Sequence, residues 1–169
     1  MKFMSPTHGI YETTEALINH IIEKIKANPL SEWTIAVGTD SQNSGTKTRF
    51  CSAFLLIEKG NGGNYFYSTS LCPKIKVIQQ RLFREAELSI KLGKEMLKIF
   101  EQKLETEVFD ECDYNIHFEI HCDFGHNGKS KNSIQAAIGW ITSEFNGLVE
   151  TKIKPNSPAA SQVADKYTK

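Results

Sequence analysis

The sequence predicts an α/β fold with a mixed five-stranded sheet in the order βββαβαβα, flanked by helices and preceded by one extra helix. Three observations predict this α/β arrangement. Apolar residues recur at helical spacing in several segments, and runs rich in β-branched and aromatic residues lie between them. Turn signals alone separate the first three of these runs, whereas helical segments separate the later ones. A meander followed by helical crossovers gives a mixed sheet with helices on its faces.

The first half of the chain supplies the extra helix and the three meander strands. Residues 12–27 have an amphipathic helical pattern that an Asn-Pro pair stops. Strands are predicted at 33–40, 47–59 and 64–72. The "GNGG" between the last two is a typical turn sequence. These three strands are therefore expected to form an antiparallel meander.

The second half supplies the crossover units. Residues 76–105 predict one long helix with an apolar stripe, and residues 115–123, "NIHFEIHCD", predict a fourth strand. A helix at 131–146 is closed by the glycine that follows it, and "LVETKIK" predicts a short fifth strand. Pro158 at the first helical position opens a last helix, with Ser157 as its N-cap.

Length and composition indicate one soluble domain over residues 1–169, with residues 1–30 as an N-terminal helical extension. The 20 basic and 20 acidic residues cancel, so net charge gives no argument for a nucleic-acid partner. The four cysteines form no CxxC pair and no secretory signal precedes them, which predicts reduced thiols in a cytoplasmic protein. No apolar run approaches the roughly 20 residues that span a bilayer, so no membrane partner is expected.

Two predicted strands end in an aspartate, Asp40 and Asp123. If these short apolar strands lie adjacent and parallel at the centre of the sheet, both carboxylates emerge at the same edge. Two close carboxylates repel each other unless a cation or a shared proton relieves them. Hard oxygen ligands suit Mg²⁺ or Mn²⁺, as in two-metal phosphodiester hydrolysis. The alternative is that each aspartate is a plain turn residue.

Further acids are available to the same edge. Glu85 lies early in the long helix, about 60° from its apolar stripe at 100° per residue, and can reach the sheet edge. Glu87 points further away and is interpreted as a surface residue, although it remains the alternative helix carboxylate. Asp165 lies in the last helix and could close the cluster from a third side. Each of these acids taken alone is more often a solvated helix residue.

Three segments, "VGTDSQ", "HCDFGHNGKSKNSI" and "KPNSPAASQVADKYTK", resemble the signature blocks of the bacterial YkuK family, a group within the ribonuclease H-like superfamily. The resemblance covers most of the chain beyond the N-terminal helix. It implies a ribonuclease H-like fold and a divalent-metal site. Carried over to this sequence, the metal-binding and catalytic carboxylates would be Asp40, Glu85, Asp123 and Asp165.

The loop after the fourth strand suggests accessory roles. "DFGHNGKSKNS" fails the P-loop pattern, because that pattern needs a glycine where Asp123 stands. Lys129 and Lys131 near a helix N-terminus could still bind a substrate phosphate, and Gln42 after Asp40 could position phosphate or water. His126 could orient water or move a proton. The alternative in each case is an ordinary polar surface.

A zinc site on "HFEIHCDFGH" is disfavoured, because His117 and His121 are about 13 Å apart along an extended strand. The leading hypothesis is a metal-dependent nuclease with Mg²⁺ or Mn²⁺ that acts on RNA, DNA or a hybrid. The second hypothesis is a non-catalytic nucleic-acid-binding or protein-interaction module on the same fold, because fold does not guarantee activity. Convergence of the four carboxylates would discriminate between them.

Overall fold

The computed structural model describes residues 1–106, 114–123 and 131–169, and its strands form one mixed sheet. Within this described part, the strands are β1 (Phe3–Ser5), β2 (Gly9–Tyr11), β3 (Glu32–Ser44), β4 (Lys47–Glu58), β5 (Gly62–Pro73), β6 (Asn115–Cys122) and β7 (Glu150–Ile153). Their order across the seven-stranded sheet is β2-β1-β5-β4-β3-β6-β7.

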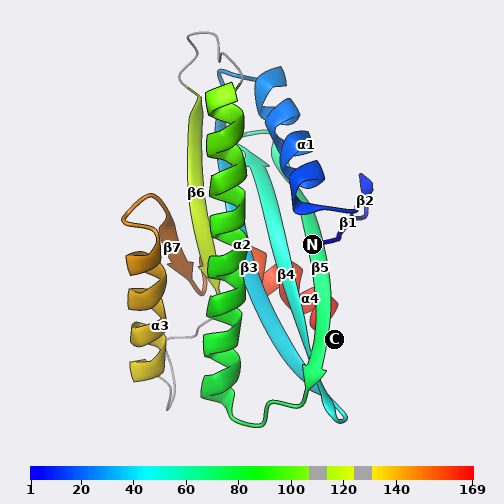
Figure 1. The fold of residues 1–169 in the computed structure, drawn as a ribbon, viewed down its shortest axis with the longest axis vertical. Coiled ribbons are helices and arrows are strands. Elements are labelled where there is room, and N and C mark those ends of the chain that lie inside the picture. The colour runs from blue at the N-terminus through cyan, green and yellow to red at the C-terminus, as the bar shows by residue number, and fades with distance from the viewer. Residues whose placement is uncertain (107–113, 124–130) are drawn as a thin grey trace.

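Helices cover both faces of this sheet. The described helices are α1 (Thr14–Ala27), α2 (Ile78–Thr106), α3 (Lys131–Glu144), the π-helical segment η1 (Ala159–Ala164) and α4 (Asp165–Thr168). In Figure 1, α1 and α2 lie in front of the sheet and α4 lies behind it. Helix α3 packs against α2 and β7. None of the helices in the described ranges is long and apolar enough to cross a membrane.

The central pairing of the sheet confirms the predicted α/β topology. Strand β3 pairs with β4 in antiparallel fashion and with β6 in parallel fashion, and β6 pairs with β7 in parallel. The long strands β3, β4 and β5 form the expected meander. Because β3 and β6 run parallel and adjacent, their carboxyl ends point to the same edge of the sheet, where sites in α/β proteins form.

The prediction of five strands was wrong by two. Residues 1–30 are not a purely helical extension, because β1 and β2 form a short hairpin that pairs with β5 and widens the sheet. Each of these strands has three residues. That length is too short for an alternating pattern to be recognised. Strand β2 begins at Gly9, whose positive φ of 79° is a conformation that glycine adopts readily.

Helix α1 shows why the apolar periodicity of its segment predicted a helix. The side chain of Thr13 caps it by accepting a hydrogen bond from the backbone N–H of Ala16. Its buried side chains recur at helical spacing and join the main core between α1, α2 and the sheet; they include Leu17, Ile18, Ile21, Ile22 and Ile25. Burial of each such side chain stabilises the fold by about 1.5–3 kcal/mol.

Two boundaries differ from the prediction in ways that affect the site. Strand β3 continues to Ser44, so Asp40 lies inside the strand opposite Cys51 and not at its tip. The hairpin with β4 holds these extra residues in ladder pairs. Ser157 is not the side-chain N-cap of the last helix, because its buried hydroxyl has no hydrogen-bond partner.

The approach of η1 to β3 requires a glycine in the strand. A Cβ atom on Gly38 would lie 2.7 Å from the backbone N of Ala160 and 2.9 Å from the backbone O of His121. Real Cβ atoms essentially never come so close to backbone atoms. Gly38 therefore lets η1 pack directly on the centre of the sheet, two residues before Asp40.

Candidate functional site

Asp40 and Ser41 direct their side chains to opposite faces of the central strand. Oδ2 of Asp40 accepts a hydrogen bond of 3.2 Å from the hydroxyl of Thr168 in α4. The hydroxyl of Ser41 donates to Oε1 of Glu85 in α2, at 2.5 Å. Because neighbouring side chains in a strand alternate between faces, Asp40 lies on the face covered by η1 and α4. Ser41 lies on the face covered by α2.

Glu85 is the buried carboxyl of α2. Its residue is 4% exposed, and it points to the sheet as the helical phase predicted. The pKa of Glu85 is raised to about 8, mainly by burial, and the negative charges of Asp40 and Asp123 contribute to this rise. Glu87, the alternative, is exposed and forms an ion pair of 2.5 Å with Arg84. The sheet-facing carboxyl of this helix is thus Glu85.

Asp123 follows the last residue of β6, at the same edge of the sheet as Asp40. Nζ of Lys154, one residue beyond β7, lies 2.5 Å from Oδ1 of Asp123. Oδ1 of Asp123 is buried and accepts no other hydrogen bond, so the ion pair with Lys154 is its polar contact. Burial raises the pKa of Asp123, and Lys154 opposes that shift. Asp123 is therefore paired with one partly exposed ammonium group, which opposes the effect of burial on its pKa.

Asp165 begins α4, on the same side of the sheet as Asp40. Its carboxylate accepts a hydrogen bond of 2.8 Å from Nζ of Lys169. Aromatic contacts with β5 fix this helix: the rings of Tyr67 and Tyr167 stack with centroids 3.5 Å apart, and the hydroxyls of Tyr65 and Tyr167 lie 3.0 Å apart. Tyr167, two residues after Asp165, thus anchors the last helix on β5.

The four acids interact through their charges. Burial raises the pKa of Asp40 to about 6, and the charges of Asp123 and then Asp165 add to this rise. Asp165 also raises the pKa of Asp123. Three of the acids, Asp40, Asp123 and Asp165, thus share one end of the sheet, and Glu85 approaches from the α2 side. Carboxylates raise one another's pKa in this way when they are brought together without a cation.

The chemistry of this donor set fits a divalent cation. All four acids offer hard oxygen ligands of the kind that Mg²⁺ and Mn²⁺ prefer. The raised pKa of Asp40 and the buried oxygen of Asp123 mark positive charge as the missing component. Among the described residues, however, no three His, Cys, Asp or Glu side chains already form a metal-binding group. Binding of a cation would therefore require Lys154 to leave Asp123.

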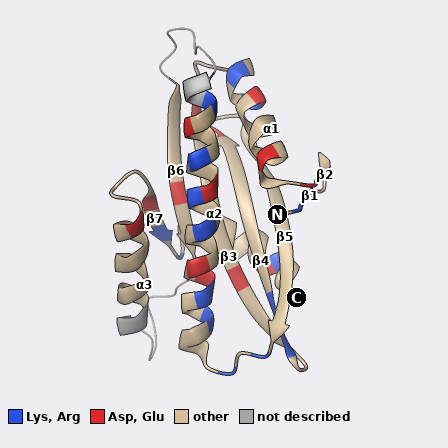
Figure 2. Cartoon of the chain, in the orientation of Figure 1, with Lys and Arg blue, Asp and Glu red and all other residues tan. Residues whose placement is uncertain are grey.

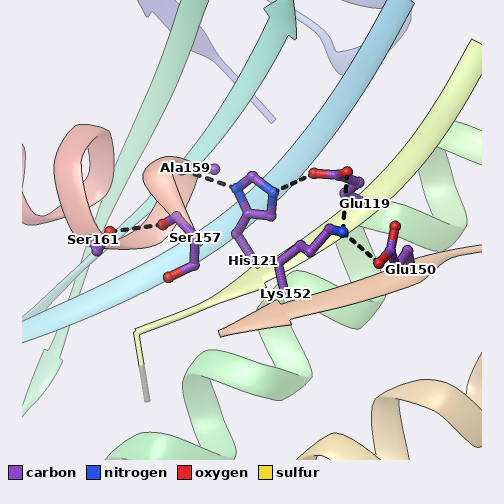
Figure 3. A network of polar contacts seen from close by, with 7 residues as sticks. All are labelled: Glu119, His121, Glu150, Lys152, Ser157, Ala159 and Ser161. Carbon is purple, nitrogen blue, oxygen red and sulfur yellow. Dashed lines mark hydrogen bonds and ion pairs between the residues drawn. The ribbon is translucent and has the colours of Figure 1, made fainter. Parts of the chain in front are cut away.

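A second polar network ties η1 to β6 beside the acids (Figure 3). Nδ1 of His121 accepts a hydrogen bond of 3.1 Å from the backbone N–H of Ala159. That nitrogen must be unprotonated to accept, so Nε2–H donates to Glu119, at 2.7 Å. Lys152 contacts Glu119 in turn and pairs with Glu150. His121 is thus a buried neutral residue that positions the segment leading to Asp165.

The predicted accessory residues have different outcomes. His126 and Lys129 lie outside the described residues, as does the side chain of Lys131, whose backbone begins α3. Gln42 is exposed in β3 opposite Arg49, two positions beyond Asp40 on the same face. The predicted roles of these residues in substrate binding and proton transfer stay predictions.

The sequence interpretation missed two close partners of the acids, Lys154 and Thr168. Lys154 did carry a usable signal. Its signal was its position just after a strand that runs parallel to β6, because such a position lies at the same edge as Asp123. Thr168 carried no signal, because nothing in its segment shows that its hydroxyl reaches back 128 positions to Asp40.

Known proteins are similar to this chain in sequence. The sequence pattern described as "Ribonuclease H-like" matches residues 16–169, and the chain belongs to this family. It is also similar to the uncharacterized protein YkuK of Bacillus subtilis (strain 168). The two are 27% identical over 182 aligned positions, covering 98% of this chain and all of that protein. The predicted family resemblance is thereby confirmed.

A solved structure resembles the chain more distantly. It is the crystal structure of RNase H1 from the halophilic archaeon Halobacterium salinarum NRC-1, with a TM-score of 0.40 and 10% sequence identity. The match covers 79% of this chain and 96% of that one.

Proposed function

We propose that this chain is a divalent-metal-dependent nuclease that hydrolyses phosphodiester bonds of nucleic acid. The observation that carries the proposal is the electrostatic coupling of Asp40, Asp123 and Asp165 at one end of the sheet, with buried Glu85 beside them. Such an accumulation of carboxylates costs folding free energy, because charge repulsion and burial both oppose ionisation. Perturbed acids of this kind cluster at functional sites.

In the proposed reaction, Asp40, Asp123 and Asp165 hold Mg²⁺ or Mn²⁺ and Glu85 completes the ligand set. The bound cations would activate water and stabilise the leaving oxygen. Hydrolysis breaks the bond between phosphorus and the 3′ oxygen, which leaves a 3′-hydroxyl and a 5′-phosphate. The hydroxyl of Ser41 orients Glu85. Lys154, once released from Asp123, is proposed to contact a substrate phosphate.

The accessory residues complete this proposal at the rim. Gln42 is exposed on the same face as Asp40 and is proposed to contact the substrate backbone. Lys129 and Lys131 are proposed to bind phosphate, and His126 is proposed to move a proton, on the chemistry of their side chains alone.

A cleavage assay tests the proposal. Single-stranded, duplex and hybrid substrates are offered with Mg²⁺ or Mn²⁺ to the wild type, Asp40→Asn, Glu85→Gln and Glu87→Gln. We expect metal-dependent cleavage that the first two substitutions abolish and Glu87→Gln retains, because Glu87 is exposed on the same helix. No cleavage of any substrate, together with no metal-induced rise in melting temperature, would falsify the proposal.

One observation favours a second candidate, a non-catalytic nucleic-acid-binding or protein-interaction module. The described acids do not form a ready metal-binding group, and Lys154 already neutralises Asp123. Under this alternative, the lysine replaces the metal and the acids serve the fold. Thermal stability that is unchanged by millimolar Mn²⁺ would favour it over the nuclease.

A further inference from the structure

A groove on the outer side of α2 lies opposite the face that carries Glu85. It has a volume of about 520 Å³ and runs between the first turns of α2 and the side chain of Trp140 in α3. Phe83 and Trp140 line it with ring centroids 6.5 Å apart and planes tilted by 40°. Phe83 is 37% exposed, an unusual position for a phenylalanine.

The aromatic rings of this groove are partly exposed, and the indole N–H of Trp140 has a partner. The indole N–H of Trp140 donates to Glu144 at 2.9 Å, so its only polar atom already has a partner. The amides of Gln79 and Gln80 add donors and acceptors to the lining. Flat rings flanked by amides suit a planar, hydrogen-bonding ligand.

The charge around the groove selects an anionic partner. Residues 74–84 carry Lys74, Lys76, Arg81 and Arg84 and contain no acid. Figure 2 shows this positive charge along the start of α2 and the segment before it. Glu87 pairs with Arg84 and Glu144 pairs with Lys94, so the excess positive charge beside the groove comes from Lys74, Lys76 and Arg81. Planar bases joined by phosphates combine the two properties that this surface recognises.

We infer that this groove binds unpaired bases of single-stranded nucleic acid by stacking them on Phe83 and Trp140, while the cations of residues 74–84 contact the phosphates. Stacking platforms with a cationic margin are the usual means of binding single strands, and the base faces of a duplex are not available to them. The inference rests on the proposed function, because it names single-stranded nucleic acid as the substrate class of the proposed nuclease. A protein partner is disfavoured by the amides of the lining and by the cations of residues 74–84 beside it.

Tryptophan fluorescence tests the groove directly, because the chain has two tryptophans and Trp33 is 3% exposed. Asp40→Asn protein without added metal is titrated with a twelve-nucleotide oligothymidine and with the corresponding duplex. The single strand is expected to quench Trp140 and the duplex to do so much less. Phe83→Ala is expected to weaken single-strand binding at least about fivefold, the effect of losing one stacking contact. Val77→Ala, at an exposed position outside the lining, is the matched control and should retain affinity.

Three results would overturn the inference: no quenching by the single strand, equal quenching by the duplex, or equal affinity of Phe83→Ala and Val77→Ala. An apolar dye that binds the groove, is lost in Phe83→Ala and is not displaced by oligonucleotide would instead indicate a protein partner. Phe83→Leu keeps the volume without the ring and guards against a folding defect. Wild-type cleavage without quenching rejects the groove alone, whereas quenching without cleavage rejects the nuclease alone.

Discussion

The hydroxyl of Thr168 donates a hydrogen bond of 3.2 Å to Oδ2 of Asp40, and this bond joins the last helix to the central strand. Thr168 is 2% exposed, and the same hydroxyl also lies 2.9 Å from the carbonyl of Asp165. A single contact therefore links the two acids that lie furthest apart in the sequence. Stability of α4 and ionisation of Asp40 should be coupled through it.

Thr168→Val is expected to lower the free energy of unfolding by about 1–2 kcal/mol. The loss should be larger at pH 8 than at pH 5, because the hydroxyl stabilises the charged form of Asp40 and its loss raises the pKa of that carboxyl further. Urea unfolding at the two pH values measures this, with Thr69→Val on the exposed face of β5 as control. An equal loss at both pH values would show that the hydroxyl serves only the Asp165 carbonyl.

The metal-free protein should lose stability as the pH rises. Folding raises the pKa of Asp40 to about 6 and that of Glu85 to about 8. The folded state thus binds more protons than the unfolded state between about pH 4 and pH 8, and the unfolding free energy falls by up to about 1.4 kcal/mol per pH unit for each proton.

Glu85→Gln should flatten the upper part of this pH dependence and make the metal-free protein more stable than the wild type at pH 8. Unfolding series from pH 5 to pH 9 measure both proteins. On the proposed function, added Mg²⁺ should stabilise the wild type more at pH 8 than at pH 5. A wild-type curve that rises across this range contradicts the raised pKa values.

Lys154 should compete with a metal for Asp123, because its ammonium group occupies the place of the missing positive charge. Lys154→Met is expected to tighten Mn²⁺ binding about two- to fivefold, a small effect because the side chain is 46% exposed. Isothermal titration measures this. Lys152→Met, which affects the pairs with Glu150 and Glu119, is the matched control and should leave affinity unchanged. Weaker binding in Lys154→Met would show that the lysine assembles the site.

His121 should act through structure and not as a metal ligand. His121→Leu leaves the Ala159 N–H and the Glu119 carboxylate without their partner, which is expected to cost about 2–4 kcal/mol of stability. His117→Leu, on the exposed part of the same strand, should change stability by less than about 0.5 kcal/mol. Differential scanning with and without Zn²⁺ measures both. Stabilisation by zinc that depends on both histidines would revive the zinc site.

Long periodic segments of this chain could be predicted from sequence, and short or tertiary features could not. The apolar stripe of α2 indicates which side of the helix faces the sheet. From this helical phase, Glu85 was correctly predicted to point inward and Glu87 outward. The hairpin of β1 and β2 has three residues in each strand, and it is stabilised by the pairing of β1 with the edge of β5. Strand β3 was predicted to stop at Asp40, because polar residues after it masked a ladder that pairing with β4 maintains.

The acids could be proposed as a site because apparent strand ends and helical phase are local properties of the sequence, and their role in a site stays a prediction. Their partners were not predicted, since the contacts of Lys154 with Asp123 and of Thr168 with Asp40 depend on how distant segments meet. The same reason explains Ser157, which has the local chemistry of an N-cap but is buried without a partner. The local preference of a serine for the N-cap position is overridden here, because the packing of η1 on Gly38 fixes the backbone.

The separation of Asp40 and Thr168 by 128 positions also sets an order of events during translation. The strand with Asp40 leaves the ribosome first, and at about 5–20 residues per second the segment that completes its surroundings follows on the order of ten seconds later. On the proposed function, a nascent chain would therefore lack a complete site until the segment that carries Asp165 and Thr168 has left the ribosome.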